Sequence, residues 1–237
     1  MLMYSVGQPV AYLFAMGVGL ATLVDAQGAA AFGGVSYLTF IAPALLVSAA
    51  VMTAANEFTF PVMAGFKWRR TYFGPHASPL TPSQIAAGHI MAVTLRLLAQ
   101  SAIYFVVVSL FGASPQGGAW AGILVATLAG LSFGLPLMAY SASITEDKGQ
   151  FALVMRLIVM PLFLFSGTFF PLDTLPLAVR WIGWISPIWH GTELGRVVSY
   201  GYEEPGLLTL VHVAVLVGLA VAGWILTRRR FEKRMGQ

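Results

Sequence analysis

The sequence has no cysteine and few charged residues. Without cysteine there is no disulfide and no thiolate metal site, and the four histidines lack the paired spacing of a zinc site. Only 9% of the residues are charged, whereas a soluble domain carries about a quarter. So few charges cannot cover the surface of a water-soluble chain of 237 residues. The composition therefore excludes an ordinary soluble protein.

Motifs for bond chemistry are also missing. None of the lysines, Lys67, Lys148 and Lys233, closes the G-x-x-x-x-G-K-S/T pattern of an ATP-binding loop. No Ser/His/Asp or paired-carboxylate spacing is present, and the carboxylates lie at the ends of apolar runs or between them, which disfavours a proton relay or an intramembrane hydrolase. We expect no catalytic residue, cofactor or metal on this chain. Any ATP and its Mg²⁺ are expected on a partner.

Long apolar runs make up most of the sequence. Hydrophobic residues make up 58% of the chain, and the mean hydropathy is +0.80. Each run is long enough to cross a bilayer, which needs about 20 residues. The sequence therefore predicts an all-α membrane protein, a single domain over 1–237, with six transmembrane helices at 8–24, 35–55, 90–111, 119–143, 151–170 and 207–226.

Basic residues set the expected orientation, because cytoplasmic loops retain Lys and Arg. They cluster after the second, fourth and sixth runs, whereas the opposite loops hold only Arg180 and Arg196 among several acids. Both termini are thus expected in the cytoplasm. Because the basic residues lie beside apolar runs rather than along one solvated face, the net charge of +4 indicates a membrane and no nucleic acid. The clustered residues are Lys67, Arg69, Arg70, Lys148, Arg228, Arg229, Arg230, Lys233 and Arg234.

The outer loop 171–205 is too rich in tryptophan and aliphatic residues to be a simple connector. It contains Trp181 and Trp184 and is interrupted by Pro176 and Pro187. Because tryptophan favours the headgroup level, we expect two short helices that lie in the outer interface or re-enter it. The alternative is an amphipathic surface loop.

The inner loop 59–84 mixes aromatic and basic residues over one or two helical turns. One interpretation is a docking helix for a partner. The other is retention of positive charge on the inner side with binding of lipid headgroups, which composition alone favours. The residues concerned are Phe66, Lys67, Trp68, Arg69, Arg70, Tyr72 and Phe73.

Two charges lie near hydrocarbon: Glu57 at the inner end of the second run and Arg96 inside the third. An unpaired Arg at a helix centre costs about 2.5 to 3.5 kcal/mol on insertion scales, so we expect a structural ion pair between them, with a moving gate as the alternative. The histidines His89, His190 and His212 each stand alone in the sequence. We expect them to be packing or interfacial residues rather than ligands.

Small residues recur every four positions in the first and fourth runs. Such spacing lets helix backbones approach closely. It fits packing within one subunit and a dimer seam equally well. The residues are Ala11, Ala15 and Gly19, and Gly122, Ala126, Gly130 and Gly134.

Read in order, several motifs resemble the permease subunits of type-2 ABC exporters, in particular the branch that includes nodulation lipo-oligosaccharide exporters. The most specific is F-S-G-T-F-F-P-L-D at 165–173, which includes Ser166, Gly167 and Pro171 and is followed by Leu175-Pro176. Other motifs that carry the resemblance are Pro9, Tyr12, Leu13, Phe14, Gly17, Gly19, Tyr37, Phe40, Ala42, Pro43, Ser78, Pro79, Leu80, the SFGLP run at 132–136, Pro187 and His190.

This resemblance implies a half-transporter of the cytoplasmic membrane that pairs with a second permease and two cytoplasmic ATPase subunits. It favours the docking interpretation of 66–73 and a re-entrant segment after the fifth run. The implied cargo is a lipo-oligosaccharide or other glycolipid moved outward, with a drug or polyketide as the alternative. Such permeases start with an amphipathic cytoplasmic helix, whereas about seven residues precede the first run here. If that helix is absent, contact with the ATPase is expected to rest on the inner loop.

Two other classes stay open from the residues alone. An ATP-independent secondary transporter or channel is disfavoured, because no acid lies in the middle of a run. A structural membrane anchor would not need the tryptophan-rich outer loop.

Overall fold

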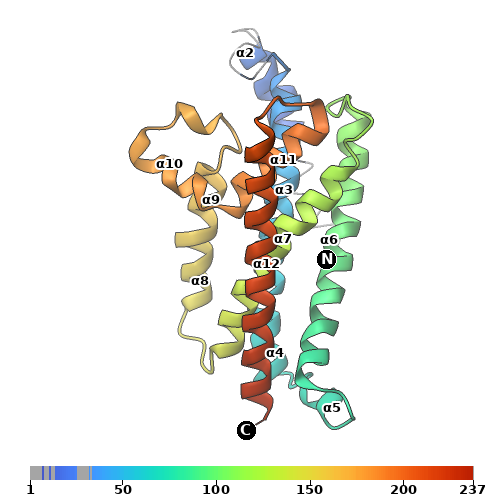
Figure 1. Ribbon diagram of the computed structural model, residues 1–237, viewed down its shortest axis with the longest axis vertical. Coiled ribbons are helices and arrows are strands. Elements are labelled where there is room, and N and C mark those ends of the chain that lie inside the picture. Colours follow the sequence, from blue (N-terminus) through green and yellow to red (C-terminus); the bar gives the residue numbers. More distant parts are fainter. Residues whose placement is uncertain (1–6, 8–10, 12–13, 26–31, 33, 237) are drawn as a thin grey trace.

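The computed structural model is an elongated helical bundle, and it describes residues 7, 11, 14–25, 32 and 34–236 (Figure 1). All regular elements of these residues are helices, which confirms the all-α prediction for this part of the chain. In chain order they are η1 Ala15–Leu20, α2 Ala21–Asp25, α3 Tyr37–Glu57, α4 Phe60–Phe66, α5 Phe73–His76, α6 Pro82–Leu110, α7 Ala121–Ser143, α8 Gln150–Val154, η3 Met155–Val159, α9 Met160–Phe165, η4 Leu172–Thr174, α10 Leu177–Trp184, α11 Pro187–Tyr200 and α12 Gly206–Met235.

Four helical stretches are long and apolar enough to cross a membrane, and a fifth apolar stretch, Gln150–Phe165, is shorter. The predicted span 8–24 lies partly outside the described residues, and its described part from 15 to 24 is helical. The described chain thus contains four of the predicted spans as long helices. These four are Tyr37–Phe66, Pro82–Leu110, Ala121–Ser143 and Gly206–Met235.

Several helices begin or end at other residues than the predicted spans, each for a local reason. Helix α6 begins at Pro82 rather than at 90, because Thr81 and Gln84 form a reciprocal capping box. The fifth helical stretch ends at Phe165 rather than at 170, since the chain turns at Gly167, which takes a φ of 71°. Helix α4 occupies part of the predicted loop 59–84, and α12 continues past 226 to Met235.

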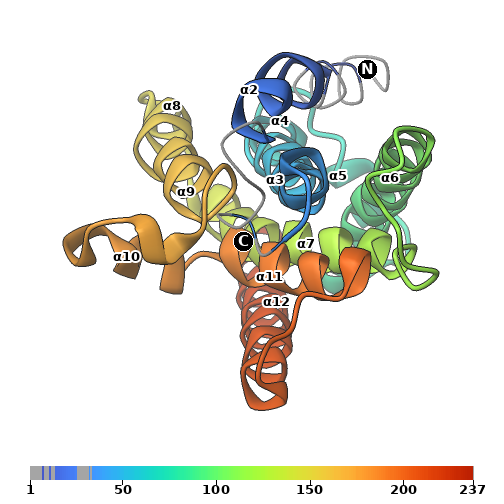
Figure 2. The same ribbon diagram turned by 90° about the horizontal axis from the view of Figure 1, so that it is seen from above.

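Helix α3 forms the centre of the bundle. Of the 18 most apolar consecutive residues in Tyr37–Phe66, 83% are buried, whereas only 17% are buried in the corresponding stretch of Gly206–Met235. Helix α7 contacts both α3 and α12, and Figure 2 shows α6, the α8–α9 stretch and α12 around this pair. Helices α6 and α12 leave leucines such as Leu95, Leu110 and Leu210 exposed. Apolar surface of this extent is suited to lipid rather than to water.

The two ends of the bundle differ in content. Helices α2, α10 and α11 lie at one end, which we call the α11 end (Figure 1). Helix α5, the turn between α7 and α8 and the C-terminus of α12 lie at the other, which we call the α5 end (Figure 1). The segments at the α5 end are those that hold the clustered basic residues.

Candidate functional site

The segment predicted as a docking helix at the α5 end does not form one helix. Helix α4 ends at Phe66, the chain then turns, and the four-residue α5 begins at Phe73. Arg70 between them takes a φ of 51°, which lies in the left-handed region. A continuous docking helix over 66–73 is therefore wrong, because a residue in this conformation interrupts a right-handed helix.

The seven predicted docking residues divide into buried and exposed groups. Phe66 and Tyr72 are buried, and their ring centroids lie 4.8 and 5.2 Å from that of Phe231 in α12. Phe73 is half-buried. Of the seven, the side chains left at the surface are those of Lys67, Trp68, Arg69 and Arg70.

Arg234 ties the end of α12 to this segment. Its guanidinium carbon lies 4.2 Å from the centroid of the Phe66 ring, and its Nη1 donates to the carbonyl of Ala142 at 2.8 Å. A cation over an aromatic face contributes about 0.5 to 2 kcal/mol, depending on exposure. The last turns of α12 thus support α4 and the C-terminal end of α7.

A cavity of about 510 Å³ opens beside the exposed residues, and Trp68, Arg69, Tyr72 and His89 line part of it. The Tyr72 hydroxyl and Nδ1 of His89 lie 3.0 Å apart. Nε2 of His89 has no hydrogen-bond partner within the described part of the chain. The α5 end therefore presents an aromatic and basic hollow rather than a smooth helix.

The two charges expected to pair do lie together. Nη1 of Arg96 donates to Oε1 of Glu57, which joins the end of α3 to α6. The side chains of Arg96 and Glu57 are 40% and 22% exposed. The contact is that of a structural pair, and its role as a gate stays a prediction.

The small residues of α7 pack within the subunit. A Cβ on Gly130 would lie 3.2 Å from the carbonyl oxygen of Ala50 in α3, and one on Gly122 would lie 3.7 Å from Leu46. Gly134 faces Phe58 and Ala54 in the same way, and Ala126 is fully buried. Those positions of the first run that the structure describes, Ala11, Ala15 and Gly19, are exposed.

The two short helices expected in the outer loop are present. Helix α10 follows Pro176, and α11 begins at Pro187, with Ser186 accepting a hydrogen bond from the Ile188 amide at 3.1 Å. Proline suits the first turn of a helix, where its missing N–H has no partner to lose. Ser166 donates to Ser186 at 2.6 Å, which links the end of α9 to the start of α11. Pro171 precedes η4, and Trp181 and Trp184 of α10 are exposed.

A cavity of about 600 Å³ lies at the α11 end, where the turn after Pro171, α10, α11 and the chain leading into α12 meet. Its wall combines aromatic rings with charged groups. Its lining includes Phe40, Asp173, Arg180, Trp184, Trp189, Glu193, Arg196, Tyr200, Tyr202, Glu203 and Glu204. We call it the outer pocket, after the sequence prediction that loop 171–205 faces outward.

A buried ion pair forms one wall of the outer pocket. Nη1 of Arg196 donates to Oε1 of Glu193 at 2.7 Å, and Nη2 donates to the carbonyl of Gly167 at 2.6 Å. The guanidinium carbon also lies 3.8 Å from the centroid of the Phe40 ring in α3. The sequence interpretation treated Glu193 and Arg196 as loop charges. Their i, i+3 spacing on a helix is the signal that it missed.

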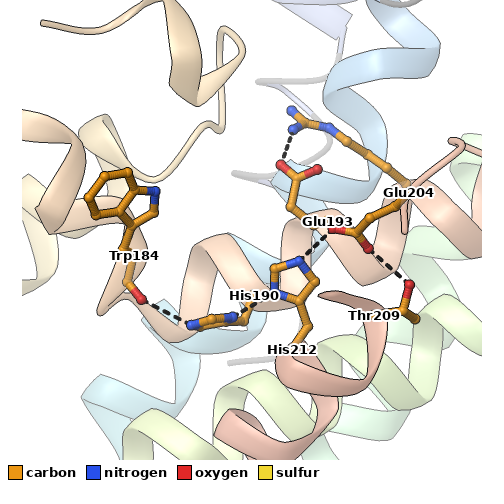
Figure 3. A network of polar contacts seen from close by, with 7 residues as sticks. Trp184, His190, Glu193, Glu204, Thr209 and His212 are labelled. Atoms are coloured by element: carbon orange, nitrogen blue, oxygen red, sulfur yellow. Dashed lines mark hydrogen bonds and ion pairs between the residues drawn. The ribbon is translucent and has the colours of Figure 1, made fainter. Parts of the chain in front are cut away.

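The interpretation of the histidines as isolated is wrong for His190 and His212. Their Nδ1 atoms lie 2.6 Å apart, and Nε2 of His212 lies 2.7 Å from Oε1 of Glu204 (Figure 3). Nε2 of His190 lies 3.0 Å from the carbonyl oxygen of Trp184, and Thr209 donates to Oε2 of Glu204 at 3.1 Å (Figure 3). Burial and the charge of His212 lower the pKa of His190 to about 4. No sequence spacing indicates this pairing.

The sequence matches one transporter family model over most of its length and named relatives over nearly all of it. The model of the ABC-2 type transporter family matches residues 1–200. Nodulation protein J of Rhizobium leguminosarum bv. viciae is 26% identical over 98% of this chain and 86% of its own length. Nodulation protein J of Bradyrhizobium diazoefficiens is 27% identical over 99% of this chain and 86% of its own length. No solved structure matches this chain.

Proposed function

This chain belongs to the ABC-2 type transporter family, and from that premise we propose that it moves an amphiphilic substrate outward, driven by ATP hydrolysed on separate chains. The chain is a permease subunit integral to the cytoplasmic membrane. The family membership carries the proposal. The exposed apolar faces of α6 and α12 support it, because a protein with such faces needs lipid around them.

In the proposed topology, the chain is one transmembrane domain over 1–237 that crosses the membrane six times. The α5 end lies in the cytoplasm, because the segments there hold the clustered basic residues. At the α11 end, Arg180 and Arg196 bond to groups of the chain itself. Helices α10 and α11 are proposed to re-enter the outer leaflet, with Trp181 and Trp184 at headgroup level.

The proposed partners are two copies of an ABC ATPase, which bind ATP and Mg²⁺, and a second permease, identical or different. The ATPase docks on the exposed residues of the inner loop, Lys67, Trp68, Arg69 and Arg70, and beside the cavity next to them. Its closure is transmitted through Phe66 and Tyr72 to α12, because these rings contact Phe231.

The proposed substrate is a lipo-oligosaccharide or related glycolipid, as the resemblance of the motifs implies. The aromatic and carboxylate lining of the outer pocket supports a polar headgroup at that end. A hydrophobic drug or polyketide is the second candidate, as the resemblance of the motifs also implies.

Reconstitution tests the proposal. The chain is purified with its ABC ATPase partner and placed in vesicles that enclose ATP, and the export of a fluorescent lipo-oligosaccharide and of a polyketide is compared. We expect export of the glycolipid to require both chains and ATP. An ATPase with its catalytic glutamate replaced is the control. Transport at full rate by vesicles that lack the ATPase would show a secondary transporter or channel instead.

A further inference from the structure

A chain of polar contacts runs through the α11 end, from the carboxylate of Glu204 through His212 and His190 to the carbonyl of Trp184 (Figure 3). The side chains of His212 and Glu204 are 0% and 4% exposed. His190 is 3% exposed. These groups depend on one another for hydrogen bonds, because a buried polar group without a partner is costly.

The geometry sets the number of protons. A carbonyl oxygen only accepts, so Nε2 of His190 must carry a proton toward Trp184. The two Nδ1 atoms at 2.6 Å need one proton between them, since two lone pairs facing each other repel. Nε2 of His212 and Oε1 of Glu204 need another. The three contacts therefore hold three protons.

Two neutral imidazoles supply only two of these protons. The third makes His212 an imidazolium beside the Glu204 carboxylate, or leaves Glu204 a neutral acid beside two neutral rings. Either arrangement has no net charge, which suits a buried cluster. The pKa of His190, lowered to about 4, agrees with a neutral His190 in both.

A metal ion does not explain the contact between the histidines. Two nitrogens bound to one tetrahedral zinc lie about 3.3 Å apart, given Zn–N bonds of about 2.0 to 2.1 Å. The separation here is 2.6 Å, which is that of a short hydrogen bond. Among the described residues there is no group of three or more ligands that suits a metal.

The neighbouring charged groups leave this chain of contacts undisturbed. Arg196 pairs with Glu193, and Arg180 donates to the carbonyls of Leu175 and Asp173. Helix α7, which contacts α11 and α12, has no charged residue. Burial raises the pKa of Tyr200 to about 12 and also raises that of Tyr202, so both hydroxyls stay neutral. The remaining charged groups on the pocket wall are Asp173 and Glu203.

We propose that Glu204, His212 and His190 form a proton-dependent latch, which holds the end of α10, the start of α11 and the start of α12 together while the third proton is bound. When this proton passes to water, two of the remaining groups face each other without a hydrogen, and one contact breaks. Trp184 and Glu204 line the outer pocket, so its mouth loosens. The latch rests on the proposed function in one respect, which is that the pocket lies on the outer side of the membrane.

Trp189 reports on the latch, because its ring centroid lies 4.8 Å from that of His212 and 5.0 Å from that of His190. The other five of the six tryptophans are replaced by Phe, which leaves the backbone carbonyl at 184 in place. Fluorescence of this variant of the 237-residue chain in lipid nanodiscs is followed against pH. A protonated imidazole quenches a neighbouring indole, so emission rises as the third proton leaves if that proton makes His212 an imidazolium. If Glu204 holds the proton instead, the broken contact changes how the histidine rings pack on Trp189, so we expect emission to change with pH in either arrangement.

Glu204→Gln and Glu203→Gln form the matched pair of variants, since each removes one carboxylate at adjacent positions. Loss of the Glu204 carboxylate removes the group with which His212 shares the third proton, so we expect the pH midpoint of the emission change to move to lower pH. Glu203→Gln is expected to leave that midpoint unchanged, because nothing in the described chain bonds to that side chain. Equal shifts in the two variants, or no titration in the parent chain, would overturn the latch.

A second pair keeps the test decisive if Glu204→Gln does not fold. His190→Asn places an acceptor where Nδ1 lies and keeps a partner for His212, whereas His190→Gln keeps only the contact with Trp184. We expect the pH midpoint of the emission change to equal that of the parent chain in His190→Asn and to lie at lower pH in His190→Gln. Identical midpoints would rule out the latch. The nanodiscs contain no ATPase, so the result is independent of whether transport uses ATP.

Discussion

Arg196 shows how a cation is accommodated in the interior of this protein. Its side chain is 3% exposed, and the carboxylate of Glu193, the carbonyl of Gly167 and the ring of Phe40 surround it. The pair joins α11 to the turn after α9 and to α3. A buried pair of this kind can be nearly neutral for stability as a whole, whereas removing one partner leaves a costly unpaired charge.

Arg196→Met is therefore expected to lower the free energy of unfolding by about 3 to 5 kcal/mol, because Glu193 loses its partner. The double variant Glu193→Leu, Arg196→Met should recover most of this loss, since no buried charge remains. Thermal unfolding in one detergent at constant pH measures both. Additive losses in the double variant would contradict a buried pair.

The pKa of His190 predicts a stability change in acid. The group has a pKa of about 4 in the folded chain and about 6.5 when unfolded, so the unfolded state binds more protons between these values. Stability is then fully present above about pH 6.5 and is lost as the pH falls toward 4. Unfolding at pH 7 and pH 5 should show this loss in the parent chain and a smaller one in His190→Gln. Equal losses would exclude His190 as the source.

At the scale of elements, α7 is the helix that holds the bundle together. It contacts α3 on one side and α12 on another, and its glycines let α3 approach closely. The close approach of α12 rests on Gly223 of α12 itself, where a Cβ would meet Pro136 of α7 at 2.5 Å. The small residues of α7 therefore serve packing inside the subunit, and a role in a seam between subunits stays a prediction.

Gly130→Ala should destabilise the chain by about 1 to 3 kcal/mol, because the added carbon crowds the Ala50 carbonyl and Leu97. Gly218→Ala is the matched control on α12, where an added carbon meets nothing within 4 Å in the described structure, and it should be neutral or slightly stabilising. Unfolding in detergent measures both, and size-exclusion chromatography reports the oligomeric state. A change of oligomeric state without loss of stability in Gly130→Ala would favour the seam.

At the scale of the whole molecule, the bundle is asymmetric. The α5 end combines exposed basic residues with a hollow beside Trp68, whereas the α11 end encloses charged groups in a pocket. Helix α12 reaches from one end to the other (Figure 1), with His212 in its first turns and Phe231 in its last. Helix α12 therefore connects the two ends directly, so a movement at one end can be transmitted to the other through this helix.

Replacing Lys67, Arg69 and Arg70 by Glu should abolish ATP-coupled export, because these exposed side chains form the proposed ATPase contact. Replacing Arg228, Arg229 and Arg230 by Glu changes the charge equally at the same end and should leave export largely intact. Export is measured in vesicles with the ATPase, and protease accessibility checks that both variants insert correctly. Unaltered export in the first variant would remove the docking role.

Local patterns in the sequence were sufficient for the outline of this fold. Apolar runs predicted four of the long helices, since the length of an apolar run and the thickness of a bilayer are both read directly from residues. Pro176 and Pro187 predicted the two short helices, because proline limits where a helix can begin. The capping box of Thr81 and Gln84 is an equally local signal for the start of α6.

Only the tertiary structure decided which side chains meet. His190 and His212 are 22 positions apart, and Arg196 and Gly167 are 29 apart, so neither contact follows from a helical period. Phe66 and Tyr72 resemble their exposed neighbours in sequence, yet Phe231 of α12 covers both. The sequence by itself determined a membrane bundle with a basic end. The latch and the division of the inner loop depend on how distant helices cross, because contacts between them are set by packing rather than by local pattern.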